Sequence, residues 1–245
     1  MKKIVLAFSG GLDTSFCVPY LKEKGYDVYA VTVDTGGFTR GEMNKIKNRA
    51  KELGVTKHFV IDGKPDLYHQ IVSYVIKANV LRGGVYPLCA GPERIIQAAK
   101  VIDIAKQIGA SAVAHGSTGA GNDQVRFDVA IHTLAPTLEI VTPIRELGMS
   151  RSEEVEYLQK HGIPVETSSK DYSVNKGMLG TTIGGKETKN SWELPPDDVY
   201  PTVVDIESAP KNGEEIIISF QKGLPTAVNG KPADGIKIMN FLDKL

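Results

Sequence analysis

The residues best suited to chemistry lie close to the start of the chain, where residues 9–15 read Ser-Gly-Gly-Leu-Asp-Thr-Ser. Two adjacent glycines allow the backbone to turn tightly and to approach a bound anion closely. If a helix begins here, its unpaired amide groups and the positive end of its dipole favour a phosphate group. The hydroxyl groups of Ser9, Thr14 and Ser15 would supply further hydrogen-bond donors. This stretch therefore predicts a phosphate-binding loop.

Two features limit what this loop can be. No lysine follows the glycines, so the loop differs from the Gly-Lys-Ser/Thr loop that holds β- and γ-phosphates in common nucleoside triphosphatases. The glycines could also form an ordinary turn, with Asp13 as the N-cap of the following helix. The apolar run before the loop and the helical pattern after it favour phosphate binding over that alternative.

A second polar stretch, residues 115–127, reads His-Gly-Ser-Thr-Gly-Ala-Gly-Asn-Asp-Gln-Val-Arg-Phe. Its side chains combine hydroxyl, amide, carboxylate and guanidinium groups, a set suited to a zwitterionic amino acid. Arg126 could bind a carboxylate through two parallel hydrogen bonds, and Asp123 could face an ammonium group. The alternative is structural, with His115 as a hydrogen-bonded core histidine and Asn122 with Asp123 as a helix cap.

Both stretches follow short apolar runs that must position them. Five such runs are expected to form strands, at residues 4–8, 28–33, 58–61, 112–115 and 138–141. Between the first four runs, apolar residues recur with the spacing of a helix, so we expect helices at residues 13–24, 42–53, 66–81 and 93–108. Runs that are continuously apolar are typical of parallel strands covered on both faces. We therefore expect an α/β domain over residues 1–165, with a doubly wound, mostly parallel sheet that binds ligands at the carboxyl ends of its strands.

From about residue 166 the composition changes to Ser, Lys, Gly and Pro. Clusters of these residues mark loops and turns rather than long buried elements. We expect residues 166–245 to form part of a second, α+β domain. Its elements would be strands at residues 202–206 and 215–220 and a helix at residues 234–245.

The overall composition excludes several classes of protein. The 245 residues include 29 basic and 29 acidic ones, so there is no excess positive charge to bind nucleic acid. Cys17 and Cys89 match no paired metal or redox spacing, which favours free thiols in a reducing compartment. The apolar run at residues 4–8 is too short for a membrane span or a signal peptide. We expect a cytoplasmic protein without membrane or nucleic-acid partners and without a metal site of its own.

The two polar stretches also carry a resemblance to a known family. Residues 9–15 resemble the PP-loop of ATP pyrophosphatases, and together with residues 115–127 they make the chain similar to argininosuccinate synthase. Shorter matches occur in the same order along the whole chain, at Tyr86-Pro87-Leu88, Pro143, Arg145-Glu146, Ser150-Arg151, residues 161–165, Tyr172-Ser173 and Pro195-Pro196.

The resemblance implies an adenine nucleotide alpha hydrolase-like fold and a ligase of arginine biosynthesis. Such an enzyme joins citrulline to aspartate through citrullyl-AMP and releases AMP and pyrophosphate, with Mg²⁺ arriving on the ATP. The implied ATP-binding residues are Ala7, Ser9, Gly10, Gly11, Leu12, Asp13, Thr14, Ser15, Val33 and Gly116. The implied contacts with citrulline and aspartate are Tyr86, Thr118, Asn122, Asp123, Arg126, Ser173 and Thr182. Catalytic roles would fall to Asp13, Ser15 and Arg126.

The chain also departs from the family pattern. Gly91 stands where the family usually has a small hydroxyl residue near citrulline, and Ala120 replaces a frequent lysine. Family members continue further and use a C-terminal helix to form tetramers, so we expect a homo-oligomer or a missing C-terminal fragment. The alternatives are a shortened paralogue or a split-enzyme subunit that binds ATP and an amino acid without full catalysis, and another PP-loop adenylylating enzyme.

Overall fold

The computed structural model describes residues 2–165, 172–200 and 203–245. The chain divides into two compact units. Unit 1 contains Met1–Gly63 and Gly91–Thr167, and unit 2 contains Lys64–Ala90 and Ser168–Leu245. The segment Lys64–Ala90 thus belongs to unit 2 although unit 1 flanks it on both sides. The predicted division into domains at residues 1–165 and 166–245 stays a prediction.

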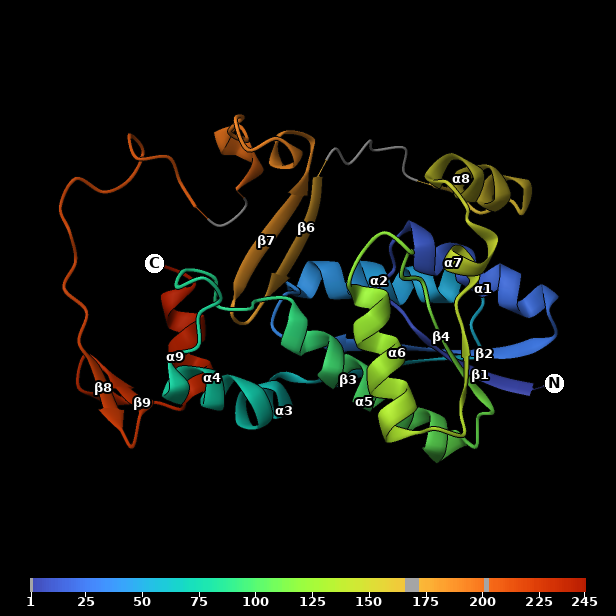
Figure 1. Cartoon of the computed structure of the whole chain (residues 1–245), viewed down its shortest axis with the longest axis horizontal. Coiled ribbons are helices and arrows are strands. Elements are labelled where there is room, and N and C mark those ends of the chain that lie inside the picture. The colour runs from blue at the N-terminus through green and yellow to red at the C-terminus, as the bar shows by residue number, and fades with distance from the viewer. Residues whose placement is uncertain (1, 166–171, 201–202) are drawn as a thin grey trace. The chain divides into compact units, whose positions relative to one another are not determined.

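Unit 1 is built on a five-stranded sheet with the order β3-β2-β1-β4-β5. Figure 1 labels β1, β2, β3 and β4 of this sheet. The strands are β1 (Lys2–Ala7), β2 (Tyr26–Asp34), β3 (Lys57–Asp62), β4 (Ala112–His115) and β5 (Glu139–Val141). All neighbouring strands pair in parallel. The predicted α/β fold with a parallel sheet is confirmed.

Helices cover both faces of this sheet, as the doubly wound prediction requires. The helices of unit 1 are α1 (Leu12–Glu23), α2 (Arg40–Glu52), α5 (Gly91–Ile108), α6 (Asp123–Leu134), α7 (Pro143–Leu147) and α8 (Arg151–Lys160). Residues of α1, α2 and α7 share one hydrophobic cluster with the sheet, and residues of α5 and α6 share the other. Helix α8 packs against α1.

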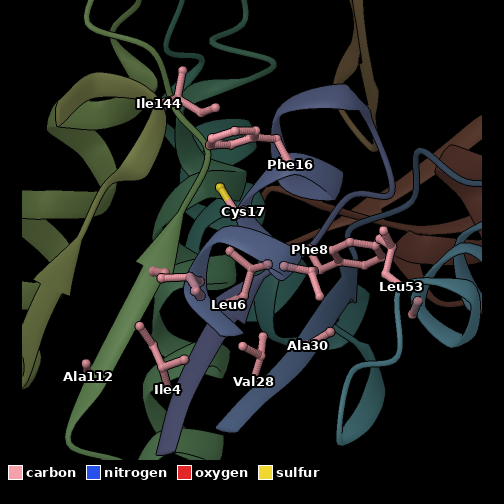
Figure 2. Close-up of a cluster of buried hydrophobic side chains, with 14 of the residues drawn as sticks. Ile4, Leu6, Phe8, Phe16, Cys17, Val28, Ala30, Leu53, Ala112 and Ile144 are labelled. Carbon is pink, nitrogen blue, oxygen red and sulfur yellow. The ribbon is translucent and has the colours of Figure 1, made fainter. Parts of the chain in front are cut away.

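The alternation of side chains along β1 explains why its whole run is apolar. Ile4 and Leu6 point into the cluster with Phe16 and Cys17 of α1, as Figure 2 shows. Val5, between them, points into the cluster formed with α5 and α6. Successive strand residues face opposite sides of a sheet, so a strand covered on both faces needs apolar residues at every position.

The described residues of unit 2 form a helical region, two antiparallel sheets and a final helix. The helical region comprises α3 (Lys64–Leu67), a π-helical turn (Tyr68–Val72) and α4 (Ser73–Ala78). The strands are β6 (Tyr172–Gly177) and β7 (Gly180–Gly185) in one sheet, and β8 (Ile218–Gln221), β9 (Leu224–Val228) and β10 (Lys231–Pro232) in the other. Two short 3₁₀ turns (Lys186–Lys189 and Asp197–Val199) and α9 (Gly235–Leu242) complete it. The α+β prediction for this part is confirmed.

Individual elements of unit 2 differ from the predictions. Residues 203–206 form no strand, and residue 202 lies outside the described residues. Val203 and Val204 are 68% and 63% exposed, so their β propensity is not supported by a neighbouring strand or by burial. The strand predicted at residues 215–220 begins only at Ile218. The hairpin of β6 and β7 was not predicted, because its many glycines suggested a loop.

The predicted final helix is present as α9. Asp234 is its N-cap and accepts a hydrogen bond from the Lys237 amide at 2.9 Å. Among the described residues, no helix combines the length and the apolar character needed to cross a membrane.

Candidate functional site

The sheet order brings the two polar loops together. The chain leaves β1 towards β2 and β3, whereas β4 lies on the other side of β1 and leads to β5. This reversal is the position at which α/β sheets bind ligands, just beyond the carboxyl ends of the strands. The contact is close, since a Cβ atom on Gly116 would lie 3.3 Å from the carbonyl carbon and from the Cβ of Asp13. The loops after β1 and β4 therefore form one site.

The first loop presents a helix N-terminus that no side chain caps. Gly11 is the N-cap of α1 and makes no side-chain capping bond, so the interpretation of Asp13 as the N-cap is wrong. Gly10 has a φ of +74°, a conformation that glycine adopts without strain. The Ser9 hydroxyl accepts a bond from the Gly11 amide at 3.4 Å, and the Thr14 hydroxyl donates to the Gly11 carbonyl at 3.4 Å. The uncapped amides can bind an anion.

Ser15 takes a different position from the other hydroxyl residues of the loop. It is 1% exposed, and its hydroxyl accepts a hydrogen bond from Nε of Arg49 at 3.0 Å. Arg49 also donates to the carbonyl oxygen of Pro164 at 2.9 Å. Arg49 of α2 thus connects Ser15 of α1 to Pro164, which follows α8. The predicted catalytic role of Ser15 stays a prediction.

The buried carboxyl group of Glu154, on α8, lies next to Asp13. Glu154 is 1% exposed, and its Oε2 has no hydrogen-bond partner. Burial, followed by the charge of Asp13 and a hydrogen bond with it, raises the pKa of Glu154 to about 8, although Arg151 acts in the opposite direction. Glu154 is therefore mainly protonated at neutral pH. The pair carries less negative charge beside the anion-binding amides than two carboxylates would.

Replacing Glu154 with glutamine is expected to change how stability depends on pH. The folded-state pKa of about 8 lies above the ordinary value of 4.5, so the folded chain holds a proton that the unfolded chain releases. The free energy of unfolding should then fall as pH rises from about 4.5 to about 8. Glutamine cannot ionise, and its amide can still donate to Asp13. Relative to the wild type, Glu154→Gln should gain up to about 4 kcal/mol of stability between pH 5 and pH 8.5, since one pKa unit corresponds to about 1.4 kcal/mol, and its Tm should rise by roughly 8–16 °C over the same range.

Differential scanning calorimetry between pH 5 and pH 8.5 measures this difference. Glu156→Gln is the matched control, because Glu156 lies on the same helix with its side chain 63% exposed. Tm curves of Glu154→Gln and wild type that stay parallel at every pH would contradict the protonated state of Glu154.

The second loop and the start of α5 form a charged cluster around Asp123. One oxygen of Asp123 accepts from Nη1 of Arg126 at 2.7 Å, and the other accepts from Nε of Arg94 at 3.0 Å. A Cβ on Gly91 would lie 3.6 Å from the Arg126 guanidinium, so this departure from the family pattern is adjacent to Arg126. Both Asp123 oxygens are engaged, so a substrate ammonium group would have to share or replace one of these bonds.

The remaining predicted residues of the second loop are exposed. Asn122 occupies the N-cap position of α6, but its side chain makes no capping bond. The interpretation of Asn122 as a capping side chain is therefore wrong. Thr118 is exposed as well. Both side chains are available to a ligand.

Ala7 and Val33 lie at the carboxyl ends of their strands. Ala7 is the last residue of β1 and is partly buried, and Val33 precedes the last residue of β2. Val33 is 5% exposed in the cluster with α5. Its side chain contributes to the hydrophobic core, and the predicted contact with adenine stays a prediction.

Three predicted residues belong to unit 2. Ser173 pairs with Gly184, and Thr182 pairs with Asn175, in the β6–β7 hairpin. Residues two apart on a strand share a face with their cross-strand partners, so Ser173 and Thr182 lie on one face of the hairpin. The Tyr86 hydroxyl accepts a bond from the Ala90 amide at 3.5 Å. Their contacts with citrulline stay predictions.

No sequence motif indicated a role for Arg94, Glu154 or Arg49. Arg94 lies in the first turn of α5, within the stretch that follows Tyr86-Pro87-Leu88. Its proximity to this family motif was the one sequence signal for a functional role. Glu154 is 141 residues from Asp13. Glu154 is a charged residue in a helix rich in polar residues, so the sequence did not indicate that its side chain is buried.

Comparison with known proteins identifies relatives along the whole chain. A family model described as the arginosuccinate synthase N-terminal HUP domain matches residues 3–164, and one described as the arginosuccinate synthase C-terminal domain matches residues 172–245. An argininosuccinate synthase of Pyrobaculum aerophilum is 43% identical over 98% of this chain and 60% of its own length. One of Methanocaldococcus jannaschii shows the same identity and coverage, and one of Oenococcus oeni is 40% identical over 99% of this chain. The chain thus spans about 60% of the length of these relatives.

Proposed function

Because the chain belongs to the argininosuccinate synthase family, we propose that it takes part in the ATP-dependent joining of citrulline to aspartate. The ureido oxygen of citrulline attacks the α-phosphorus of ATP, which forms citrullyl-AMP and releases pyrophosphate. The amine of aspartate then displaces AMP. The observation that carries this proposal is the contact between the loops after β1 and β4, where Gly116 lies against Asp13.

The triphosphate of ATP would bind at the start of α1. The uncapped amides and the hydroxyls of Ser9 and Thr14 offer donors that fit phosphate oxygens rather than a cation. No cluster of three or more His, Cys, Asp or Glu residues suited to a metal occurs in the described parts of the chain. Mg²⁺ would therefore arrive on the nucleotide, where it would neutralise part of the phosphate charge.

The amino acids would bind at the charged cluster beside this loop. The guanidinium groups of Arg94 and Arg126 both face the carboxylate of Asp123. Nη1 of Arg94 also lies 3.7 Å from Oε2 of Glu93. Arg126, whose side chain is 35% exposed, is the arginine of this cluster better placed to bind the carboxylate of a substrate. Aspartate would contact Thr118, Asn122 and Asp123. Citrulline would contact Asn122 and Arg126.

A second candidate function is binding of ATP and an amino acid without complete catalysis. One observation favours it: Gly91 lacks the hydroxyl group that the family resemblance places near citrulline. Thiolation of tRNA by another PP-loop enzyme has less support, since the 29 basic and 29 acidic residues balance and the two cysteines form no pair.

Pyrophosphate release with ATP, citrulline and aspartate tests the proposal. We expect release that depends on citrulline. In Arg126→Lys the charge remains but the forked pair of donors is lost, so the KM for citrulline should rise about tenfold, the equivalent of about 1.4 kcal/mol. Binding of ATP, measured by calorimetry, should not change.

Arg40→Lys provides the matched control, since Arg40 is exposed at the start of α2. Bound ATP without citrulline-dependent pyrophosphate would support the binding-only function. An equal loss of ATP and citrulline binding in Arg126→Lys would show general damage to the fold and contradict the role of Arg126.

A further inference from the structure

Behind the loop of residues 116–122 lies a chain of four hydrogen-bonded side chains to which the proposed function gives no role. It consists of His115 at the end of β4, Gln124 and Asp128 on α6, and Arg145 on α7. Nε2 of His115 lies 2.9 Å from Oδ1 of Asp128, and Nη1 of Arg145 lies 2.6 Å from Oδ2 of the same carboxylate. Nη1 of Arg145 also donates to Oε1 of Gln124 at 3.1 Å.

The hydrogen bonds of His115 define one tautomer. Its Nδ1 lies 3.3 Å from the amide of Ser117, and an amide can only donate, so Nδ1 must be the acceptor. Nε2 therefore carries the hydrogen and donates it to Asp128. His115 is 2% exposed and stacks on Phe127 with ring centres 5.2 Å apart. Burial is the largest influence on its pKa and lowers it, although Asp128 opposes this effect. The ring is thus neutral, and it is the hydrogen-bonded buried histidine that the sequence left as an alternative.

The other end of the chain of side chains holds the same loop at a second point. Nε2 of Gln124 donates to the carbonyl oxygen of Gly119 at 2.7 Å. A Cβ on Gly119 would lie 3.9 Å from Cγ of Arg145, so the loop also packs along the stem of that arginine. The loop is therefore bound through the amide of Ser117 and the carbonyl of Gly119, on either side of the exposed Thr118.

We propose that His115, Asp128, Arg145 and Gln124 are positioning residues that fix the loop carrying Gly116 and Thr118 against the loop after β1. A segment with three glycines among residues 116–121 has many conformations to lose. Two fixed points reduce that freedom before a ligand binds. The role rests on the proposed function, because Gly116 and Thr118 are residues that would bind ATP and aspartate.

Asp128→Asn tests the role of the carboxylate, which accepts two hydrogen bonds. Asparagine has one oxygen and one NH₂ group. The Arg145 guanidinium can only donate, so it requires the oxygen, and the NH₂ group must then face Nε2 of His115. Nε2 would become an acceptor and the hydrogen would move to Nδ1, where it would oppose the Ser117 amide. We expect nitrogen NMR of the His115 ring to show this exchange of tautomers.

Two further measurements separate positioning from general stability. Hydrogen exchange of the amides of residues 116–122 should become faster in Asp128→Asn. If the proposed function holds, kcat/KM for aspartate should fall about tenfold, by analogy with the hydrogen-bond partners that orient metal-binding histidines. Asp128→Glu, which keeps two acceptor oxygens, should restore the wild-type tautomer. Asp103→Asn is the matched control, since the Asp103 side chain is 65% exposed on α5.

The NMR and exchange measurements need no turnover, so they remain informative if the proposed reaction fails. An exchanged tautomer with faster loop exchange supports the positioning role even without pyrophosphate release. An unchanged tautomer, unchanged exchange of residues 116–122, or an equal effect of Asp103→Asn would overturn it.

Discussion

Gly116→Val is expected to weaken ATP binding about 100-fold. The Cβ of any residue at this position would already lie 3.3 Å from the carbonyl carbon and Cβ of Asp13 and from Cγ2 of Thr14. The two further methyl groups of valine would press on the first turn of α1, whose backbone cannot rotate away as a side chain could. Overpacking of this kind costs about 3 kcal/mol, which corresponds to about 100-fold in Kd. Calorimetric titration of ATP measures this effect without any turnover.

Gly121→Val provides the comparison within the same loop. A Cβ at Gly121 would meet no atom within 4 Å, so the same substitution there should leave most of the ATP affinity intact. Equal losses in the two variants would show that any bulk in the loop impairs binding. That result would remove the contact between Gly116 and Asp13 as the explanation.

Gly235→Ala is expected to destabilise unit 2 by about 3 kcal/mol, the upper end of overpacking costs. Gly235 is the first residue of α9, and a Cβ there would overlap the hydroxyl and ring of Tyr68. Tyr68 is 4% exposed in the π-helical turn, so its ring has little space into which it can move. Hydrogen exchange followed by mass spectrometry should show faster exchange in α9 and β9, which pack together.

A double variant isolates the cause of that loss. In the Tyr68→Ala background the ring is absent, so Gly235→Ala should cost little, and the higher helix propensity of alanine should even favour α9. Gly213→Ala is the control, since a Cβ at Gly213 would meet nothing within 4 Å. The same loss from Gly235→Ala with and without Tyr68 would exclude the predicted overlap.

The sequence predicted unit 1 well because its signals are local. The continuous apolar run of β1 reflects a strand covered on both faces, and the Ser-Gly-Gly stretch marks the turn into α1 within seven residues. The adjacency of the two loops follows from the strand order β3-β2-β1-β4-β5, which the alternation of strands and helices does not by itself specify. The proposed ligands came from the family resemblance, because these patterns alone do not identify them.

Other features depended on contacts between distant residues. Nothing in Lys64–Ala90 indicates which core it joins, because its helical spacing suits either unit. The carboxyl group of Glu154 and that of Asp13 meet only after α8 has packed on α1. Asp123 pairs with two arginines that come from different helices, Arg94 of α5 and Arg126 of α6, and the first of these contacts cannot be read from sequence spacing. The strand predicted at residues 202–206 is wrong because its local signal was misleading. The composition favours a strand, but residues 203–206 pair with no other strand.

Lys64–Ala90 belongs to unit 2 but lies between two segments of unit 1 in the sequence. This arrangement affects how the protein can be divided experimentally. The peptide chain passes between the units after Gly63, after Ala90 and again after Thr167, so no single cut yields two independently folding pieces. A fragment ending near residue 165 would keep Tyr68 and Lys77 but lose Gly235 and Gly223, against which they pack. An excised unit 1 would need a short bridge from Gly63 to Gly91, and unit 2 would need its two segments co-expressed or joined in a new order.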